Sequence, residues 1–266
     1  MNFPPTWRFR RYTALRDRTE SARDVLRRSA SSEEFLRGMS EISDRTIAII
    51  ERKTRGQSEN PLWFRHRAHI ITGSTCKALN GAAKKNRFDA RVKGLIAKLV
   101  AIQRPFPALK WGCENESVAR DDFITRHRGL PGFSFEERGL QLASGIGYFA
   151  ASVDGLYSFK KDGVFVRRLL EIKCPFRFSE QGNLEHDGTK LEYLDGNLQL
   201  KRVSSYYSQI QFYLHIYGME QCTLLIWCPR DFLELEIFYD TVFCTEMFAN
   251  LKRLYEERYA PSLFRE

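Results

Sequence analysis

The segment 170–176 places charged side chains inside an apolar run, in a pattern that could do chemistry. Glu171 and Lys173 lie two positions apart. Because strand side chains alternate in direction, we expect both on one face and Ile172 turned the other way, into a core. Asp154 lies upstream, one apolar segment earlier. Carboxylates beside an ammonium group can hold a hard divalent cation and stabilise charge on a phosphate, an arrangement typical of metal-dependent phosphodiester cleavage.

The simplest alternative is a surface salt bridge on an edge strand. Charged residues make up 28% of the chain, so a Glu-x-Lys triplet alone is weak evidence. The flanking residues favour a buried strand, because most of them are apolar. They are Leu169, Leu170, Ile172, Cys174, Pro175 and Phe176. Ionisable groups buried in such a strand are costly unless they are paired or bind metal.

Composition fits a protein with one substantial core, or a core with a small appended lobe, since 43% of the 266 residues are hydrophobic. The 42 Lys and Arg against 33 Asp and Glu give a net charge of +9. Such a balance fits a polyanionic partner such as nucleic acid, and equally a generically basic protein.

Cysteine usage and the terminal segment bear on the compartment. The six cysteines are scattered and form no Cys-x-x-Cys pair, which indicates a reducing setting. The Arg-rich start lacks the apolar segment of a signal peptide, and no apolar run approaches the roughly 20 residues that span a bilayer. We therefore expect an intracellular protein, in the cytoplasm or nucleus, without a membrane partner.

Apolar periodicity and turn residues predict a mixed α/β fold of the α+β type, with one central sheet flanked by helices. Residues to about 30 are Arg-rich and poorly patterned, and one apolar face then runs from a helix start at Ser31 or Ser32 to Lys53. Further helices are expected from Pro61 and over Ser74–Leu79, Glu114–Arg126, Ser204–Tyr217 and Thr245–Tyr259. Strands are expected over Gly139–Ala143, Gly147–Leu156, Gly163–Cys174, Thr223–Trp227 and Leu233–Tyr239, with a loop over residues 177–200.

A series of short motifs follows in order along residues 61 to 230. They are Trp63-Phe64-Arg65-His66-Arg67, Ile71-Thr72-Gly73-Ser74, Trp111-Gly112-Cys113-Glu114-Asn115-Glu116-Ser117-Val118-Ala119-Arg120, Ser152-Val153-Asp154-Gly155-Leu156, Leu170-Glu171-Ile172-Lys173-Cys174-Pro175-Phe176 and Tyr206-Tyr207-Ser208-Gln209-Ile210-Gln211. Each motif is only moderately specific. Together and in this order they resemble the phage lambda exonuclease and YqaJ viral recombinase family. That family belongs to the restriction-endonuclease-like nucleases with the PD-(D/E)xK motif, so the resemblance implies their fold.

The resemblance also implies a metal-dependent active site. Asp154 and Glu171 resemble the metal-binding carboxylates, with the Ile172 carbonyl as a further ligand. Glu116 resembles the additional acidic residue near the metals. Lys173 resembles the lysine that positions or activates the attacking water. The implied cofactor is Mg²⁺, with Mn²⁺ also supporting activity.

The resemblance implies supporting and substrate-binding roles for further residues. Gln209 resembles a glutamine that supports the site from a helix. Arg67 and Ser74 resemble residues that grip a terminal 5′ phosphate, although a surface charge and a helix cap would explain them equally. The implied activity is 5′→3′ exonuclease action on duplex DNA, with DNA as partner. A homo-oligomer and a single-strand annealing protein are further partners that the resemblance suggests.

Three positions keep structural alternatives. Glu116 could be a first-turn acid favoured by the helix dipole, and Glu114 could be confused with it. Asp154 precedes a glycine, as in an ordinary turn. Gln209 and Gln211 cannot share a helical face, so one of them is expected to be structural.

Two departures from the family pattern stand out. Val153 replaces the proline that many relatives carry before the aspartate, a change without expected chemical consequence because proline is not a ligand. Residues 1–60 have no clear family counterpart. We therefore expect a basic N-terminal arm and helical extension over 1–60 and a lambda-exonuclease-like nuclease domain over 61–266.

Two other functions remain open. One is a structure-selective or nonspecific DNA endonuclease of the same fold, and the other is a nucleic-acid-binding module that has lost catalysis. The retained set of Asp154, Glu171 and Lys173 argues against the second. A basic stripe is a candidate contact for the DNA backbone, and each member could equally be plain solvated surface. Its residues are Lys84, Lys85, Arg87, Arg91 and Lys93.

Overall fold

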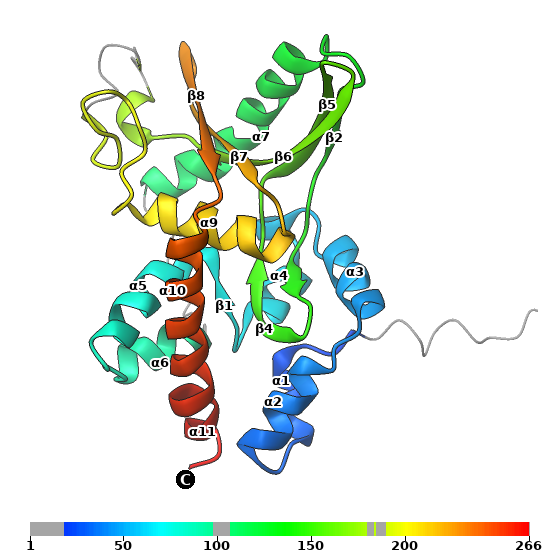
Figure 1. The fold of residues 1–266 in the computed structure, drawn as a ribbon, viewed down its shortest axis with the longest axis vertical. Helices are drawn as coiled ribbons and strands as arrows, with labels where there is room; N and C mark the ends of the chain where they lie inside the picture. Colours follow the sequence, from blue (N-terminus) through cyan, green and yellow to red (C-terminus); the bar gives the residue numbers. More distant parts are fainter. Residues whose placement is uncertain (1–18, 98–106, 180–183, 185–189, 266) are drawn as a thin grey trace, which may run out of the picture.

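Two β-sheets, rather than the one central sheet expected, form the framework of the fold (Figure 1). The computed structural model describes residues 19–97, 107–179, 184 and 190–265. The five-stranded sheet has the order β2-β5-β6-β7-β8, and the three-stranded sheet the order β1-β4-β3. The strands are β1 (Ile71–Thr72), β2 (Ser134–Glu136), β3 (Gln141–Ala143), β4 (Ile146–Ala151), β5 (Gly155–Lys161), β6 (Val164–Lys173), β7 (Gln221–Cys228) and β8 (Asp231–Phe238).

Helices cover both sheets, and α9 crosses the middle of the molecule between them (Figure 1). The helices are α1 (Ala22–Arg28), α2 (Ser32–Ser40), α3 (Asp44–Lys53), η1 (Gln57–Glu59), α4 (Pro61–Arg67), α5 (Gly73–Lys84), α6 (Ala90–Ala97), α7 (Pro107–His127), η2 (Phe176–Phe178), α9 (Ser205–Tyr217), α10 (Thr241–Arg253), η4 (Leu254–Tyr259) and α11 (Ala260–Ser262). The mixed α/β prediction is therefore confirmed.

The expected strand Gly147–Leu156 is divided between the two sheets. β4 pairs with β1 and β3, whereas β5 pairs antiparallel with β6. Between them the chain bends at Asp154, whose backbone N–H still donates to the Leu170 carbonyl at 3.1 Å. Both halves are apolar because both sheets are buried, so hydrophobic periodicity alone could not show the change of sheet.

β6 lies in the interior of the larger sheet, parallel to β7 and antiparallel to β5. Its two faces contact different cores. Leu170 and Ile172 pack against Ala119 and Phe123 of α7. Leu169 on the other face belongs to the main core. The edge-strand alternative for the Glu171 segment is therefore wrong.

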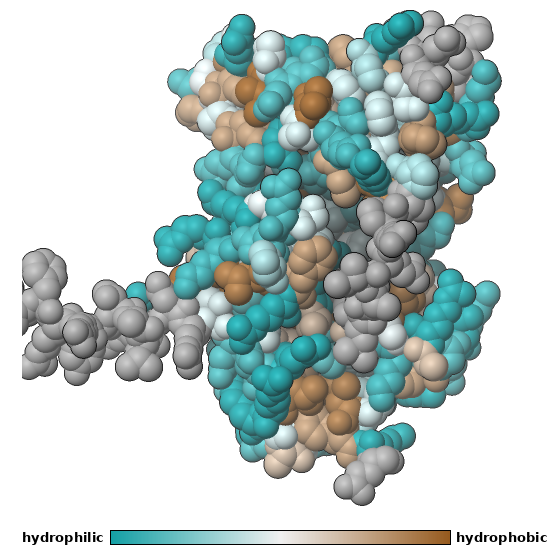
Figure 2. All heavy atoms as spheres, turned by 180° about the vertical axis from the view of Figure 1, so that it is seen from behind, coloured by the Kyte–Doolittle hydropathy of each residue, from teal (hydrophilic) through white to brown (hydrophobic). Residues whose placement is uncertain are grey.

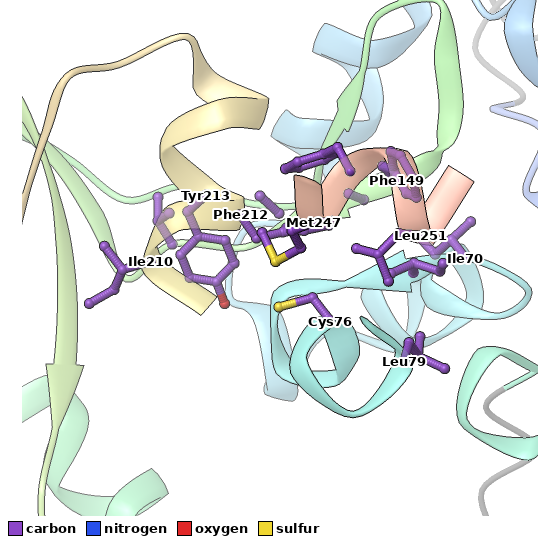
Figure 3. Close-up of a cluster of buried hydrophobic side chains, with 14 of the residues drawn as sticks. Ile70, Cys76, Leu79, Phe149, Ile210, Phe212, Tyr213, Met247 and Leu251 are labelled. Carbon is purple, nitrogen blue, oxygen red and sulfur yellow. The ribbon is translucent and has the colours of Figure 1, made fainter. Parts of the chain in front are cut away.

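The main core joins α5, α9 and α10 to the smaller sheet (Figure 3). Fully buried side chains from all of these elements meet there, and burying each one contributes about 1.5–3 kcal/mol. Figure 3 labels Ile70, Cys76, Leu79, Phe149, Ile210, Phe212, Tyr213, Met247 and Leu251. Helices α5 and α9 are thus fixed relative to each other, which matters because both carry site residues.

The N-terminal extension differs from expectation in two ways. The segment before Ser31, expected to be poorly patterned, contains helix α1, which starts at a capping box formed by Ser21 and Asp24. The expected helix to Lys53 is two helices, since Ser43 accepts from the Thr46 N–H and begins α3 anew. Residues 1–18 of the predicted arm, and 98–106 and most of 180–189, lie outside the described residues.

Glu51 of α3 ties the extension to the smaller sheet. Its buried carboxylate accepts from the Gly139 N–H at 2.9 Å and from Arg55 Nε at 3.1 Å. Arg138 Nε lies 3.3 Å from the same oxygen. Gly139 permits this approach, because a Cβ there would lie 1.9 Å from the Glu51 carbonyl oxygen. The extension therefore packs directly on the strand that begins at Gln141.

The surface seen from behind is mostly hydrophilic, with hydrophobic areas at both ends of the molecule (Figure 2). Within the described ranges, no helix is both long and apolar enough to cross a membrane.

Glu51→Ala should lower the free energy of unfolding by about 3–5 kcal/mol, because it leaves the buried Gly139 N–H without its acceptor and the Arg55 and Arg138 guanidinium groups without their carboxylate partner. Urea denaturation would measure the change. Glu59→Ala is the matched control, since Glu59 is exposed and its loss should alter stability by less than about 0.5 kcal/mol. Equal midpoints for the two variants would contradict the anchoring role of Glu51.

Candidate active site

Strand β6 presents Glu171 and Lys173 on one face, as the spacing predicts. Lys173 Nζ contacts Glu171 Oε1 directly and donates to the Ile172 carbonyl at 3.0 Å. The Glu171 side chain is 3% exposed and that of Lys173 is 21% exposed. This buried ion pair lies between the larger sheet and α9 rather than on a free surface.

Asp154 reaches the same place from the bend between the two sheets. Its Oδ2 accepts from the Ile172 N–H at 2.6 Å, and the residue is buried. The pairing of Gly155 with Leu170 fixes this register. Asp154 is therefore held beside Glu171 by hydrogen bonds from both its backbone and its side chain, which an ordinary exposed turn would not provide.

Glu116 lies in the middle of α7, because that helix begins at Pro107, earlier than expected. The first-turn alternative is therefore wrong. Glu114 is exposed and pairs with Lys110 at 3.6 Å. Glu116 instead pairs with Arg120 at 3.0 Å, one turn further along the helix. The charge of Asp154 is the largest influence on the pKa of Glu116, which places Glu116 near the other two acids.

Arg120 ends the motif that begins at Trp111, but the sequence interpretation gave it no role. It lies between Glu116 and Glu137, with an Nη1–Oε1 distance of 2.6 Å to the latter. The four-residue spacing of Glu116 and Arg120 on a helix is the signal that could have revealed it.

Gln209 and Gln211 divide as expected into a site residue and a structural residue. Gln209 Nε2 donates to Glu171 Oε1 and to the Tyr213 hydroxyl, both at 2.7 Å. Gln211 is fully buried. Its Nε2 donates to the Phe238 carbonyl at 2.7 Å, and its Oε1 accepts from the Asp240 N–H at 2.8 Å. Gln209 thus fixes one oxygen of Glu171 from α9.

Arg67 and Ser74 contact each other, with Arg67 Nη2 donating to Ser74 Oγ at 3.1 Å. The Arg67 guanidinium lies 3.6 Å from the centre of the Trp63 ring. The Trp63 indole N–H in turn donates to Ser152 Oγ at 2.7 Å, two residues before Asp154. Burial lowers the pKa of Arg67 to about 10, so the side chain remains charged at neutral pH.

A cavity of about 390 Å³ brings most of these groups together. Its lining includes Ser74, Glu116, Ile172, Lys173, Cys174, Tyr193, Tyr206 and Gln209. Tyr206 and Tyr193 were not singled out from the sequence. The Lys173 ammonium lies 5.1 Å from the Tyr206 ring centre, and Tyr193 packs edge-on against Tyr206 at 4.7 Å. One wall of the cavity is therefore aromatic.

Burial raises the pKa values of all three acids, and neighbouring negative charge adds to this for Glu171 and Glu116. Burial, and then the charge of Asp154, raise the pKa of Glu171 to about 8. Repulsion from Asp154, and then burial, raise the pKa of Glu116 to about 7. Burial also raises the pKa of Asp154. Although burial by itself lowers the pKa of Lys173, the charges of Glu171 and Asp154 raise it overall, so the ammonium group stays protonated.

The oxygen atoms present suit a hard divalent cation. Glu171 Oε2 is buried and has no hydrogen-bond partner among the described residues. A cation would satisfy this oxygen and offset the repulsion between the acids. The described chain holds no group of three or more His, Cys, Asp and Glu close enough to bind a metal by itself. Asp154, Glu171 and the Ile172 carbonyl, with Glu116 nearby, remain the predicted ligands, and Mg²⁺ usually keeps several waters.

Comparison with known proteins identifies the family of the chain. Residues 62–220 match the YqaJ-like viral recombinase domain. The chain belongs to this family. The predicted site residues, from Arg67 to Gln209, all fall within the matched range.

Two herpesvirus proteins are similar to about half of the chain. The chain is 32% identical over 139 residues to the alkaline nuclease of Elephantid herpesvirus 1, and 28% identical over 141 residues to that of Human herpesvirus 6A. These matches cover 50% and 51% of this chain, but only 27% and 26% of the relatives. The chain thus spans about a quarter of the length of the curated relatives it matches.

Solved structures share the fold. The alkaline exonuclease of Laribacter hongkongensis matches with a TM-score of 0.53 and 20% identity, over 76% of this chain and 93% of that one. The shutoff and exonuclease protein of Kaposi's sarcoma-associated herpesvirus matches with a TM-score of 0.55 and 13% identity, over 83% and 73%. The YqaJ-like domain therefore has the restriction-endonuclease-like fold of these alkaline exonucleases, as predicted.

Mg²⁺ should raise the melting temperature of this protein more at about pH 9 than at about pH 6, because metal competes with protons for the acids. The raised pKa of Glu171 means that the metal-free folded state binds its proton more tightly than the unfolded chain. Metal-free stability should therefore fall as pH rises from the ordinary glutamate value of 4.5 to about 8.

Differential scanning fluorimetry with and without Mg²⁺ would measure both effects. Glu171→Gln should remove most of the metal-induced shift, whereas Glu114→Gln should keep it. A shift of the same size at both pH values in the unmodified protein would contradict the assignment.

Proposed function

We propose that this YqaJ-like protein is a divalent-metal-dependent deoxyribonuclease that hydrolyses phosphodiester bonds, with Mg²⁺ as the cofactor and Mn²⁺ as a substitute. The observation that carries the proposal is the buried set of Asp154, Glu171 and Lys173, in which Glu171 Oε2 has no partner among the described residues. The similarity of the chain to two herpesvirus alkaline nucleases supports the proposal. The similar fold of the protein in a SOX–DNA complex, which matches with a TM-score of 0.55, also supports the proposal.

Each side chain has a task on this proposal. A bound Mg²⁺ would supply Lewis-acid stabilisation of the phosphate and lower the pKa of a bound water. Lys173, protonated and beside Glu171, can donate a hydrogen bond to the attacking water and to developing negative charge. Gln209 holds the Glu171 carboxylate in place by a hydrogen bond, and Arg120 orients the Glu116 carboxylate by another.

We propose 5′→3′ exonuclease action on duplex DNA as the favoured mode. Arg67 presents a guanidinium and Ser74 a hydroxyl at the start of α5, and Ser74 lines the cavity that holds Lys173. A guanidinium, a hydroxyl and backbone N–H groups at a helix start are suited to a phosphate. A terminal 5′ phosphate bound there would place the adjoining nucleotide near the acids.

Endonuclease action on DNA is the alternative. One related structure is described as a SOX–RNA complex, with a TM-score of 0.56 and 12% identity, so RNA belongs among the substrates to be tested. Self-association, a single-strand annealing partner and the division at residue 60 remain predictions of the sequence alone.

Glu171→Gln should lower kcat/KM on linear duplex DNA by more than about a hundredfold. The change keeps the side-chain shape but removes a predicted metal ligand, and even indirect supports of metal ligands are worth about 10–100-fold. Release of acid-soluble nucleotide would be measured with Mg²⁺ and with Mn²⁺. Glu114→Gln, an exposed acid on α7, should cut at the normal rate. Normal turnover by Glu171→Gln would exclude the active-site assignment.

Arg67→Ala should reduce the preference for a 5′-phosphorylated end over a 5′-hydroxyl end. The measurement is the ratio of initial rates on two linear duplexes that differ only in this group. Arg65→Ala is the matched control, because Arg65 lies on the same helix but pairs with Asp24 at 2.7 Å in the extension. The control should keep the preference. Equal rates of the unmodified protein on both ends, or rapid cutting of closed circles, would instead favour endonuclease action.

A further inference from the structure

A second hollow of about 400 Å³ adjoins the active-site cavity at Ser74. It runs between α5 and α6 and reaches the first residue of α9. Its lining is Ser74, Lys77, Ala78, Gly81, Ala82, Lys85, Arg87, Arg91, Leu95 and Ser205. We call it the α5–α6 groove. Ser74 belongs to both hollows, so the position of the expected 5′ phosphate has open space on two sides.

The groove extends along α5 away from the acids. Ser74 stands at the start of that helix and Lys85 directly follows its last residue. At about 1.5 Å per residue, the helix between them spans about 16 Å. The groove is therefore long enough to continue a path that enters through the active-site cavity.

The groove has a small apolar floor and a cationic rim. Ala78, Gly81 and Ala82 leave the floor shallow and free of large side chains, and a Cβ on Gly81 would meet no atom within 4 Å. Lys85 and Arg91 are exposed and make no ion pair with an acid of the described chain. Such a surface fits a ligand that is anionic on one side and flat and apolar on the other.

The groove also separates the members of the predicted basic stripe. Lys85, Arg87 and Arg91 line it. Lys84 instead pairs with Glu246 at 2.8 Å, and Lys93 donates to the Ser262 carbonyl at 3.0 Å. These two lysines are engaged with the C-terminal helices, away from the groove.

We propose that the α5–α6 groove binds an unpaired DNA strand that continues on the 5′ side of the phosphate at Arg67 and Ser74. The inference rests on the proposed nuclease function. Phosphates would meet the cationic rim, and the flat faces of the bases would lie over the small apolar floor. A hollow of about 400 Å³ can hold part of a single strand. A DNA duplex, whose major groove alone is about 12 Å wide, is too large for it.

The consequence concerns which DNA ends are accepted. If the cleft ended at Ser74, only a terminal phosphate would fit there. Because the groove continues past Ser74, a duplex with an unpaired 5′ extension can bind with its extension along α5. The first product released from such an end would then carry the extension as a short oligonucleotide.

The test compares a blunt duplex with one that carries a short unpaired 5′ extension, using the full chain and Mg²⁺. The measured quantity is the ratio of kcat/KM on the extended duplex to that on the blunt duplex. Lys85→Ala with Arg91→Ala should lower this ratio about tenfold. It should also reduce the log–log salt slope for binding the extended duplex by about 2, because two phosphates would no longer be neutralised. Lys84→Ala with Lys93→Ala removes the same charge from the same region and should keep the ratio.

Several results would overturn the inference while leaving the nuclease function intact. One is that the unmodified protein cuts blunt ends and rejects extended ends. Another is an equal loss of activity on both duplexes in the Lys85 and Arg91 double variant. An equal change of the ratio in the Lys84 and Lys93 control would do the same, because it would make the effect one of general charge.

Binding separates this inference from the proposed function. Fluorescence anisotropy of the extended duplex without metal needs no cleavage. If the unmodified protein cuts no DNA but the Lys85 and Arg91 variant still binds the extended duplex about tenfold more weakly, the groove stands and the nuclease proposal falls. If the affinity for that duplex is the same in both double variants, the groove is not a strand-binding site.

Discussion

The ion pair between Glu171 and Lys173 is the interaction on which the site depends. It is built into β6, a strand covered on one face by α7 and on the other by the main core. A buried carboxylate without a partner costs several kcal/mol, so the adjacent ammonium group is what allows β6 to hold an acid in the interior. Lys173 and Arg120 do not neutralise three acids, however. The pKa values of Glu171 and Glu116 rise for this reason and because of burial, so at neutral pH these acids hold protons that a bound cation can displace, in a protein whose net charge is +9. The acidic site therefore favours a bound cation, and the basic protein as a whole favours a polyanionic partner. Metal-assisted hydrolysis of a phosphodiester requires both.

The division into two sheets is what brings Arg67, predicted to bind phosphate, near the acidic residues. The chain leaves the smaller sheet at Ser152 and enters the larger sheet after Asp154, so this short bend belongs to both. Trp63 donates to Ser152 while its ring supports the Arg67 guanidinium. The same bend therefore positions a carboxylate on one side and an arginine on the other.

The sequence predicted the local placement of side chains along β6 well and the long-range geometry less well. The alternation along β6 is a local property, and it placed Glu171, Ile172 and Lys173 on the faces that the structure shows. The division of Gly147–Leu156 was missed because both sheets are buried and the segment is apolar throughout. The start of α7 was placed too late, which gave Glu116 a first-turn explanation that its true position removes. Tyr193 could not be found at all, because it joins the site through a loop whose path depends on tertiary contacts.

The walls of the active-site cavity differ in a way that suits a single polynucleotide strand. Tyr206 and Tyr193 form an aromatic wall, and the Lys173 ammonium lies over the Tyr206 ring. Ser74, which Arg67 contacts, contributes a hydroxyl to the same cavity. A strand of nucleic acid has two matching sides, because its bases stack on aromatic rings and its phosphates pair with polar and cationic groups. The cavity thus matches the asymmetry of a strand along its length, and this match arises from α5, β6 and α9 being locked together by one hydrophobic core.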